Sequence, residues 1–209
     1  MKLFLSSMYF GNEAEALLKM HSGSRKVAIC LNANDFLGDI GRLKYYNRTK
    51  KDFESLGFEV EEIDLRNYFN RIEELKSYIS KFGIFWATGG NTFNLRRAFK
   101  LSGMDLLLPG MLNGSDFIYG GFSAGACIMS PSLAGLNIVD NPEEIPFGYD
   151  EEIIWSGLNL VEYQIVPHYK SGSEDLATMM QEIINYYDEI NVRYIKLTDE
   201  QSVVINVLI

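Results

Sequence analysis

The chain has 209 residues, a mass of 23.8 kDa and a formal net charge of −9. This length suits a single domain, 1–209, and the 47% of hydrophobic residues is enough for a packed core. Its 19 basic residues against 28 acidic ones, without a basic run, argue against a nucleic-acid partner.

Two cysteines and two histidines exclude the common metal and disulfide scaffolds. Cys30 and Cys127 lack CxxC spacing, and His21 with His168 cannot form a multi-histidine metal centre in one chain. The first residues do not form a signal peptide, and no window reaches the ~18 apolar residues of a membrane span. We therefore expect a cytoplasmic protein with no cofactor and no membrane partner. Its oligomeric state, monomer or homodimer, stays open.

Short apolar runs alternate with longer helical patterns from the first residue onward. Strands are expected at residues 2–6, 26–33, 59–65, 83–87 and 117–122, and helices at 39–56, 71–80 and 92–101. This alternation predicts an α/β domain of three layers, a mostly parallel sheet with helices on both faces.

The second half of the chain begins with a long irregular stretch, 130–157, which holds three of the five prolines and is therefore expected to be functional. Then follow a strand at 162–166, a helix at 173–190 with Ser171 and Glu174 as a capping box, and strands at 194–197 and 202–209. The last two strands are expected to form a hairpin around Asp199-Glu200. Because the sequence stops inside an apolar run, we expect the natural C-terminus to extend a few residues further.

The most informative segment is Gly120-Gly121-Phe122-Ser123-Ala124-Gly125-Ala126, which contains G-x-S-x-G between an apolar strand and a short helical run. A sharp turn between strand and helix lifts the serine above the sheet. The next amide, that of Ala124, then lies at a helix N-terminus and can stabilise an oxyanion. The alternative is that Ser123 only caps this helix and the glycines only pack. The strand and helix around the motif favour a nucleophile.

A nucleophilic serine needs a base, and the two histidines differ in context. His168 follows a predicted strand and is expected at the same carboxyl edge of the sheet as Ser123. His21 lies in what reads as an exposed loop after a helix. His168 is therefore the candidate base, and a structural role is its alternative.

A third group, a carboxylate, should hold the imidazole of the base in the right tautomer. Candidates in the long loop are Asp140, Glu143, Glu144 and Asp150. We choose Asp140, although an aspartate in a turn before Asn141-Pro142 explains that residue equally well.

A second glycine turn, Gly89-Gly90-Asn91-Thr92-Phe93, follows a strand and opens a helix. It lacks the lysine of a phosphate-binding P-loop, and no G-x-G-x-x-G occurs in the chain. Its other use is to supply a second backbone N–H to an oxyanion hole beside Ser123.

Together with Pro167-His168-Tyr169, these two turns resemble the family of dipeptidase E (α-aspartyl dipeptidase) and cyanophycinase. Members of this family are serine peptidases on a flavodoxin-like fold similar to that of class I glutamine amidotransferases. The likeness covers nearly the whole chain, with the motifs in the family's order. It implies Ser123 as nucleophile, His168 as base, and Gly90 and Ala124 as oxyanion donors. It also implies an acid between serine and histidine, which is compatible with Asp140.

One departure from the family concerns substrate recognition. Aspartyl dipeptidases hold the substrate's aspartate with an arginine downstream of the histidine, whereas residues 169–181 contain only one cation, Lys170. A lysine lacks the bidentate fork of arginine, so aspartyl specificity is not expected. Asn91 and Lys170 are the candidate substrate-binding residues.

These observations predict a serine peptidase that hydrolyses small peptides through a Ser-His-acid triad and an acyl-enzyme. Two alternatives remain. One is an esterase or amidase on the same scaffold, and the other is a non-catalytic ligand-binding module that retains the turn. A fold alone does not separate them, so the hypothesis rests on the site residues.

Overall fold

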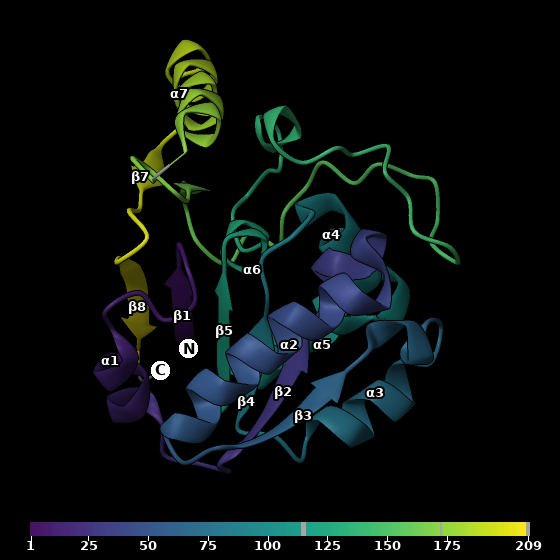
Figure 1. Cartoon of the computed structure of the whole chain (residues 1–209). Coiled ribbons are helices and arrows are strands. Elements are labelled where there is room, and N and C mark those ends of the chain that lie inside the picture. The colour runs from purple at the N-terminus through teal and green to yellow at the C-terminus, as the bar shows by residue number, and fades with distance from the viewer. Residues whose placement is uncertain (114–115, 172, 208–209) are drawn as a thin grey trace.

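A six-stranded sheet in the order β3-β2-β4-β5-β1-β8 forms the centre of the molecule (Figure 1). The computed structural model describes residues 1–113, 116–171 and 173–207. The strands of this sheet are β1 (Lys2–Ser6), β2 (Lys26–Cys30), β3 (Glu59–Ile63), β4 (Ile84–Ala87), β5 (Ile118–Phe122) and β8 (Ser202–Asn206). The first five run parallel, and β8 pairs with β1 antiparallel.

Helices cover both faces of this sheet. On one side are α1 (Ala14–Met20) and α2 (Gly38–Ser55), and on the other are α3 (Ile72–Ile79), α4 (Thr92–Ser102), α5 (Met104–Leu112) and α6 (Ala124–Cys127). Short 3-10 turns lie at Asn32–Leu37, Leu65–Tyr68 and Leu136–Ile138. The predicted three-layer α/β architecture is thus confirmed. No helix in the described ranges is long and apolar enough to cross a membrane.

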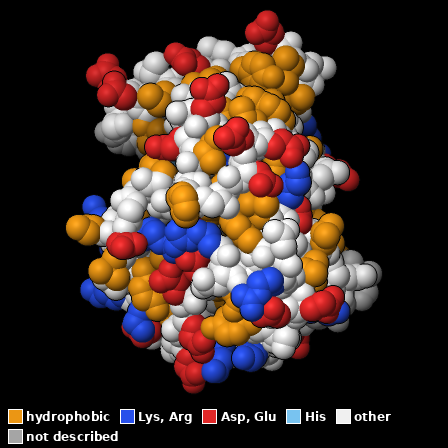
Figure 2. Space-filling view, turned by 90° about the vertical axis from the view of Figure 1, so that its right-hand side faces the viewer, with side chains coloured by type: hydrophobic (Ala, Val, Ile, Leu, Met, Phe, Trp, Pro, Cys, Tyr) orange, Lys and Arg blue, Asp and Glu red, His pale blue; other side chains and the backbone are white. Residues whose placement is uncertain are grey.

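The apolar strand sequences follow from burial on both faces. In β4, Ile84 and Trp86 pack with the α1 and α2 side, whereas Phe85 and Ala87 face the opposite core. Successive side chains of a strand point to opposite faces, so a strand covered on both sides is apolar at every position. The surface is different: Figure 2 shows a face on which acidic and basic side chains are interspersed.

A second, two-stranded sheet stands apart from the first. It pairs β6 (Gln164–Val166) with β7 (Tyr194–Lys196) in parallel, and α7 (Glu174–Glu189) connects the two strands (Figure 1). The predicted hairpin around Asp199-Glu200 is therefore wrong. Its two strands belong to different sheets, because β7 pairs with β6 and β8 pairs with β1.

Three smaller differences concern the ends and the number of elements. The N-cap of α7 is Ser173, whose hydroxyl accepts from the amide of Leu176 at 3.2 Å, so Ser171 does not cap this helix. Helix α5 is not predicted by the sequence pattern, because Pro109 and Gly110 lie inside it. The predicted last strand ends at Asn206, and positions 208–209 lie outside the described residues.

Two turns meet at the carboxyl edge of the main sheet. Strands β4 and β5 are neighbours, and Ala87 lies opposite Gly121 in their register. The chain leaves β4 through Gly89-Gly90 and leaves β5 through Ser123. Because parallel strands end at the same edge, the two glycine-containing turns lie side by side.

Candidate active site

Ser123 occupies a sharp turn between β5 and α6. Its backbone has φ 51° and ψ −115°, a conformation that a residue with a side chain rarely adopts. Its amide donates to the carbonyl of Ser6 at 3.1 Å, and α6 begins at the next residue. A side chain on Gly125 would clash with the carbonyl of Ala87, so glycine lets α6 pack against β4. The expected strand–turn–helix arrangement is present.

His168 lies within hydrogen-bond reach of the serine. Its Nε2 is 3.0 Å from Ser123 Oγ, and it follows β6 directly after Pro167. The backbone of His168 also has a positive φ, 55°, and its amide donates to Ser7 Oγ at 2.7 Å. The other histidine, His21, bonds instead to the carbonyl of Ser24 in a surface loop. The structure therefore brings together Ser123 and His168, the nucleophile and the base that are expected from the sequence.

The carboxylate beside the histidine belongs to Asp199. Its Oδ1 lies 2.7 Å from His168 Nδ1, and the hydroxyl of Ser7 donates to the same oxygen at 3.1 Å. Burial alone would raise the pKa of Asp199. The neighbouring Ser171, His168 and Ser7 side chains outweigh it, so the pKa lies below its usual value. Asp199 is thus ionised next to the imidazole at neutral pH.

Asp140 lies elsewhere, which corrects the expected position of the acid. Its Oδ2 accepts from the amide of Thr92 at 2.9 Å and from the hydroxyl of the same residue at 2.6 Å. Burial raises the pKa of Asp140 to about 6, although both bonds from Thr92 act against this rise. The amino end of α4 attracts the carboxylate, because its free amides carry partial positive charge. Glu143, Glu144 and Asp150, the other acids weighed in this loop, are exposed.

The backbone amides of Gly90 and Ala124 are the expected oxyanion donors. A Cβ added to Gly89 would lie 3.1 Å from Ser123 Cβ, so this turn directly borders Ser123. Gly90 has φ 141°, and a side chain there would clash with the carbonyl of Ala33. Within the described ranges, no protein group accepts a hydrogen bond from either amide. Both amides are therefore available to a ligand.

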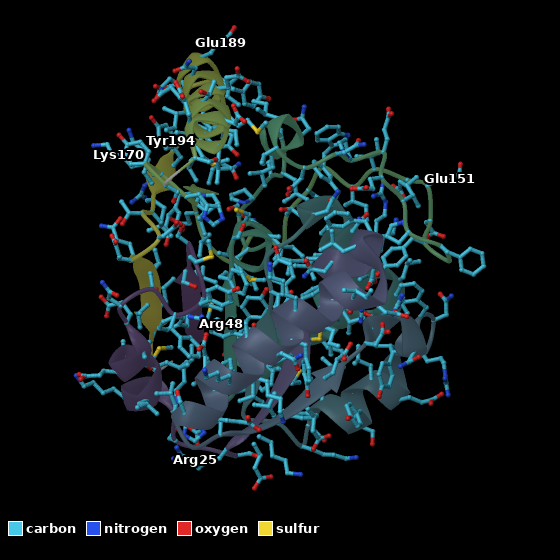
Figure 3. The ribbon with its side chains drawn as sticks, in the orientation of Figure 1. Arg25, Arg48, Glu151, Lys170, Glu189 and Tyr194 are labelled. Atoms are coloured by element: carbon cyan, nitrogen blue, oxygen red, sulfur yellow. The ribbon has the colours of Figure 1, made fainter. Side chains whose placement is uncertain are left out.

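The structure does not bring the two candidate substrate-binding residues to the site. Asn91 is buried and caps α4, because its side-chain oxygen accepts from the amides of Phe93 and Asn94. Its side-chain Nδ2 donates to the carbonyl of Asn141 at 2.7 Å. Lys170 lies on the surface over the ring of Tyr169 (Figure 3). Neither side chain lines a cavity that borders Ser123.

A thiol near the serine does not compete as nucleophile. Cys127 lies one turn further along the chain and is buried, and burial raises the pKa of this thiol far above neutral. Its thiol donates to the carbonyl of Ile165 at 3.5 Å. In the described part of the chain, no three His, Cys, Asp or Glu side chains gather to hold a metal ion.

Two cavities border Ser123 and His168. The larger has a volume of about 430 Å³ and opens toward α2, and the smaller, on the side of Asp140, has about 40 Å³. A volume of 40 Å³ holds little more than one or two water molecules. A substrate of peptide size therefore has to occupy the larger pocket.

The fold and the site together define the class of this protein. It is an α/β protein with a serine, a histidine and a carboxylate in series at a strand–turn–helix elbow on the carboxyl edge of a parallel sheet. The chain belongs to peptidase family S51, whose sequence model matches residues 36–207. The predicted resemblance to the dipeptidase E family is confirmed.

Two relatives illustrate the match. An uncharacterised peptidase of Listeria monocytogenes serovar 1/2a is 34% identical over 146 residues, which is 68% of this chain and 65% of that protein. Peptidase E of Nostoc sp. (strain PCC 7120) is 30% identical over 129 residues, 61% of this chain and 47% of that protein. The matched part thus spans less than two thirds of either relative.

Two solved structures share the fold. The 1.5 Å crystal structure of a protein described as a candidate peptidase E from Listeria monocytogenes EGD-e has a TM-score of 0.76 and 24% identity, and the match covers 99% of this chain and 98% of that one. A peptidase from an acI-B1 Actinobacterium has a TM-score of 0.57 and 16% identity, with coverage of 86% and 74%. At such identities the likeness concerns the fold alone.

Proposed function

We propose that this chain is a serine peptidase that hydrolyses small peptides, with Ser123, His168 and Asp199 as its catalytic triad. One observation carries the proposal: His168 lies between Ser123 Oγ, at 3.0 Å from Nε2, and Asp199 Oδ1, at 2.7 Å from Nδ1. The distance between Ser123 and His168 suits proton transfer from serine to histidine, and the distance between Asp199 and His168 lets the carboxylate orient the ring. Membership of peptidase family S51 supports a peptide as the substrate.

In the first step, Ser123 Oγ attacks the carbonyl carbon of the scissile peptide bond while its proton passes to His168 Nε2. The carbonyl oxygen becomes an oxyanion, which the amides of Gly90 and Ala124 stabilise. Such donors are typically worth ~3 kcal/mol each. Asp199 accepts a hydrogen bond from Nδ1–H and stabilises the imidazolium that forms.

In the second step, the carbon–nitrogen bond breaks. The proton on His168 Nε2 passes to the leaving nitrogen, so the first product departs as a neutral amine and an ester remains on Ser123. Water then attacks this ester, with His168 again accepting a proton, and the oxyanion forms in the same hole. Collapse releases the acid product and returns the proton to Ser123 Oγ.

The decisive experiment labels the nucleophile without knowledge of the substrate. The parent protein and Ser123→Ala are treated with a small neutral fluorophosphonate, and intact mass is recorded over time. We expect one adduct on the parent and none on the variant. The absence of an adduct on the parent would contradict the proposal.

A substrate panel then separates the peptidase from the esterase and amidase alternatives. Unmodified di- and tripeptides are compared with alanine ethyl ester and alanine anilide, and Ser123→Ala measures the background. We expect peptide turnover that Ser123→Ala lowers by at least about a thousandfold. Turnover of esters alone would replace the proposed reaction by ester hydrolysis.

A further inference from the structure

The larger pocket beside Ser123 has an electrostatic character that differs from the rest of the chain. Its lining includes Tyr9, Lys44, Arg48, Phe122, Ser123 and His168. Among the described residues that line it, two are permanent cations and none is Asp or Glu, in a chain where acids outnumber bases by 28 to 19. A local excess of positive charge next to a nucleophile favours an anionic group on the ligand.

Two ring contacts connect one of these cations, Arg48, to the segment that carries Ser123. The ring of Tyr9 lies 4.7 Å from that of Phe122, the residue immediately before Ser123. The guanidinium carbon of Arg48 lies 5.1 Å from the centre of the Tyr9 ring, over its face. The Nε of Arg48 is 3.1 Å from Asp52 Oδ2. Stacking and this ion pair restrict the side chain, so Arg48 has a defined position at the pocket wall.

The second cation is free to bind a ligand. Lys44 lies one turn before Arg48 on α2, so both side chains extend from the same face of the helix. Lys44 is exposed and has no ion pair with any described residue. Arg48, by contrast, shares its charge with Asp52. Figure 3 labels Arg48 on α2, well away from Lys170 at the end of the molecule near β7.

The smaller cavity beside Ser123 disfavours an anion. The 40 Å³ cavity there is lined in part by Asp140, whose negative charge would repel a second carboxylate. A substrate carboxylate near the scissile bond would therefore lie toward α2.

We propose that Lys44 and Arg48 bind a carboxylate of the substrate and set the specificity of the enzyme for acidic or short peptides. This inference rests on the proposed peptidase function. The carboxylate can come from the free C-terminus of a short peptide or from an acidic side chain next to the scissile bond. In both cases, cations on α2 would bind the carboxylate, instead of an arginine after His168.

The test measures protection of Ser123 from the neutral fluorophosphonate. The competitors are Ala-Ala, Ala-Ala amide, Ala-Asp amide and Asp-Ala amide, used with the parent protein, Lys44→Glu, Arg48→Gln and Lys51→Glu. Lys51 is exposed on the same helix but does not line the pocket, so Lys51→Glu makes the same change of net charge outside it. Adduct formation without competitor shows that each variant is folded and reactive.

For the parent we expect an acidic competitor to protect Ser123 at about one tenth of the concentration that Ala-Ala amide requires. Lys44→Glu should abolish this difference, Arg48→Gln should reduce it, and Lys51→Glu should leave it unchanged. Protection by Ala-Ala identifies a C-terminal carboxylate, whereas protection by an aspartyl amide identifies an acidic side chain. Peptide cleavage by the same variants should follow the same order in KM.

Two results would overturn the inference in different ways. If Ser123 is labelled but acids and amides protect equally, or if Lys51→Glu acts like Lys44→Glu, the recognition site is refuted and the peptidase proposal stands. If the parent forms no adduct at all, the proposed function fails and the inference falls with it.

Discussion

Asp199 Oδ1 lies 2.7 Å from His168 Nδ1, although 31 positions separate the two residues in the chain. They are close because they follow β6 and β7, the paired strands of the small sheet. The connection from β7 to β8 carries the aspartate across from the two-stranded sheet toward the six-stranded one. The geometry of the proposed triad therefore depends on how these two sheets are joined.

Asp199→Asn should lower kcat for peptide hydrolysis by about 10³- to 10⁴-fold. The amide NH₂ of asparagine would donate to Nδ1 and place the proton on Nε2, so the imidazole could no longer accept a proton from Ser123. Steady-state kinetics on the best peptide of the panel measures the loss. Glu200→Gln, a change at the exposed neighbouring carboxylate, is the control and should stay within about threefold of the parent. Equal losses in both variants would refute the role of Asp199.

Ser123→Gly should be more stable than Ser123→Ala by about 1 kcal/mol in the free energy of unfolding. Alanine keeps a Cβ at φ 51°, whereas glycine adopts this conformation freely. The gain is limited because glycine also increases the entropy of the unfolded chain. Urea unfolding followed by far-UV circular dichroism gives the comparison. Should the alanine variant prove the more stable, the turn stores no strain at the nucleophile.

Gly90→Ala should destabilise the protein by about 2–4 kcal/mol and also lower turnover. A Cβ at this position would clash with the carbonyl of Ala33, and the backbone has φ 141°. Gly110 in α5 offers a matched control, because a Cβ there meets no atom within 4 Å. Gly110→Ala should stabilise the protein by about 0.5–1 kcal/mol. Thermal melting of both variants tests the contrast. Equal shifts, or a higher melting temperature for Gly90→Ala than for Gly110→Ala, would contradict it.

Asp140→Asn should raise stability at pH 7.5 by about 1–3 kcal/mol, and this advantage should disappear near pH 4. The pKa of Asp140 is about 6 in the folded protein, above the ~3.9 of an unfolded chain. Between these values the folded state binds more protons, so this residue makes the free energy of unfolding fall as pH rises. Asparagine keeps an oxygen to accept from Thr92 but carries no buried charge.

Urea unfolding at pH 4, 5.5 and 7.5 measures this effect as the difference between parent and variant. Asp150→Asn changes an exposed carboxylate of the same loop and serves as the control. A difference that stays constant over this pH range would show that burial does not penalise the charge of Asp140.

The local parts of the site could be predicted from the sequence. Gly121-Phe122-Ser123-Ala124-Gly125 follows an apolar strand and precedes a helix, and the steric requirements of that turn depend only on neighbouring residues. His168 could be placed because it follows a predicted strand. The mostly parallel sheet followed from the alternation of strands and helices, since parallel strands need crossover connections. The order of its strands came only from the structure.

The acid could not be predicted, because its position depends on strand pairing. Asp199-Glu200 has the composition of a hairpin turn, and only the pairing of β7 with β6 and of β8 with β1 brings Asp199 to His168. Asp140 has a loop position compatible with a triad, yet the amino end of α4 holds it.

The sequence by itself determined the α/β architecture, the nucleophile turn and the identity of the candidate base, because each depends on local periodicity or on backbone sterics. Only the tertiary structure decided which carboxylate faces the histidine and which cations line the pocket beside Ser123. Lys44 and Arg48 read as an ordinary charged helix surface in the sequence. The role proposed for them rests on the packing of Tyr9 between Phe122 and α2, a contact among three segments far apart in the chain.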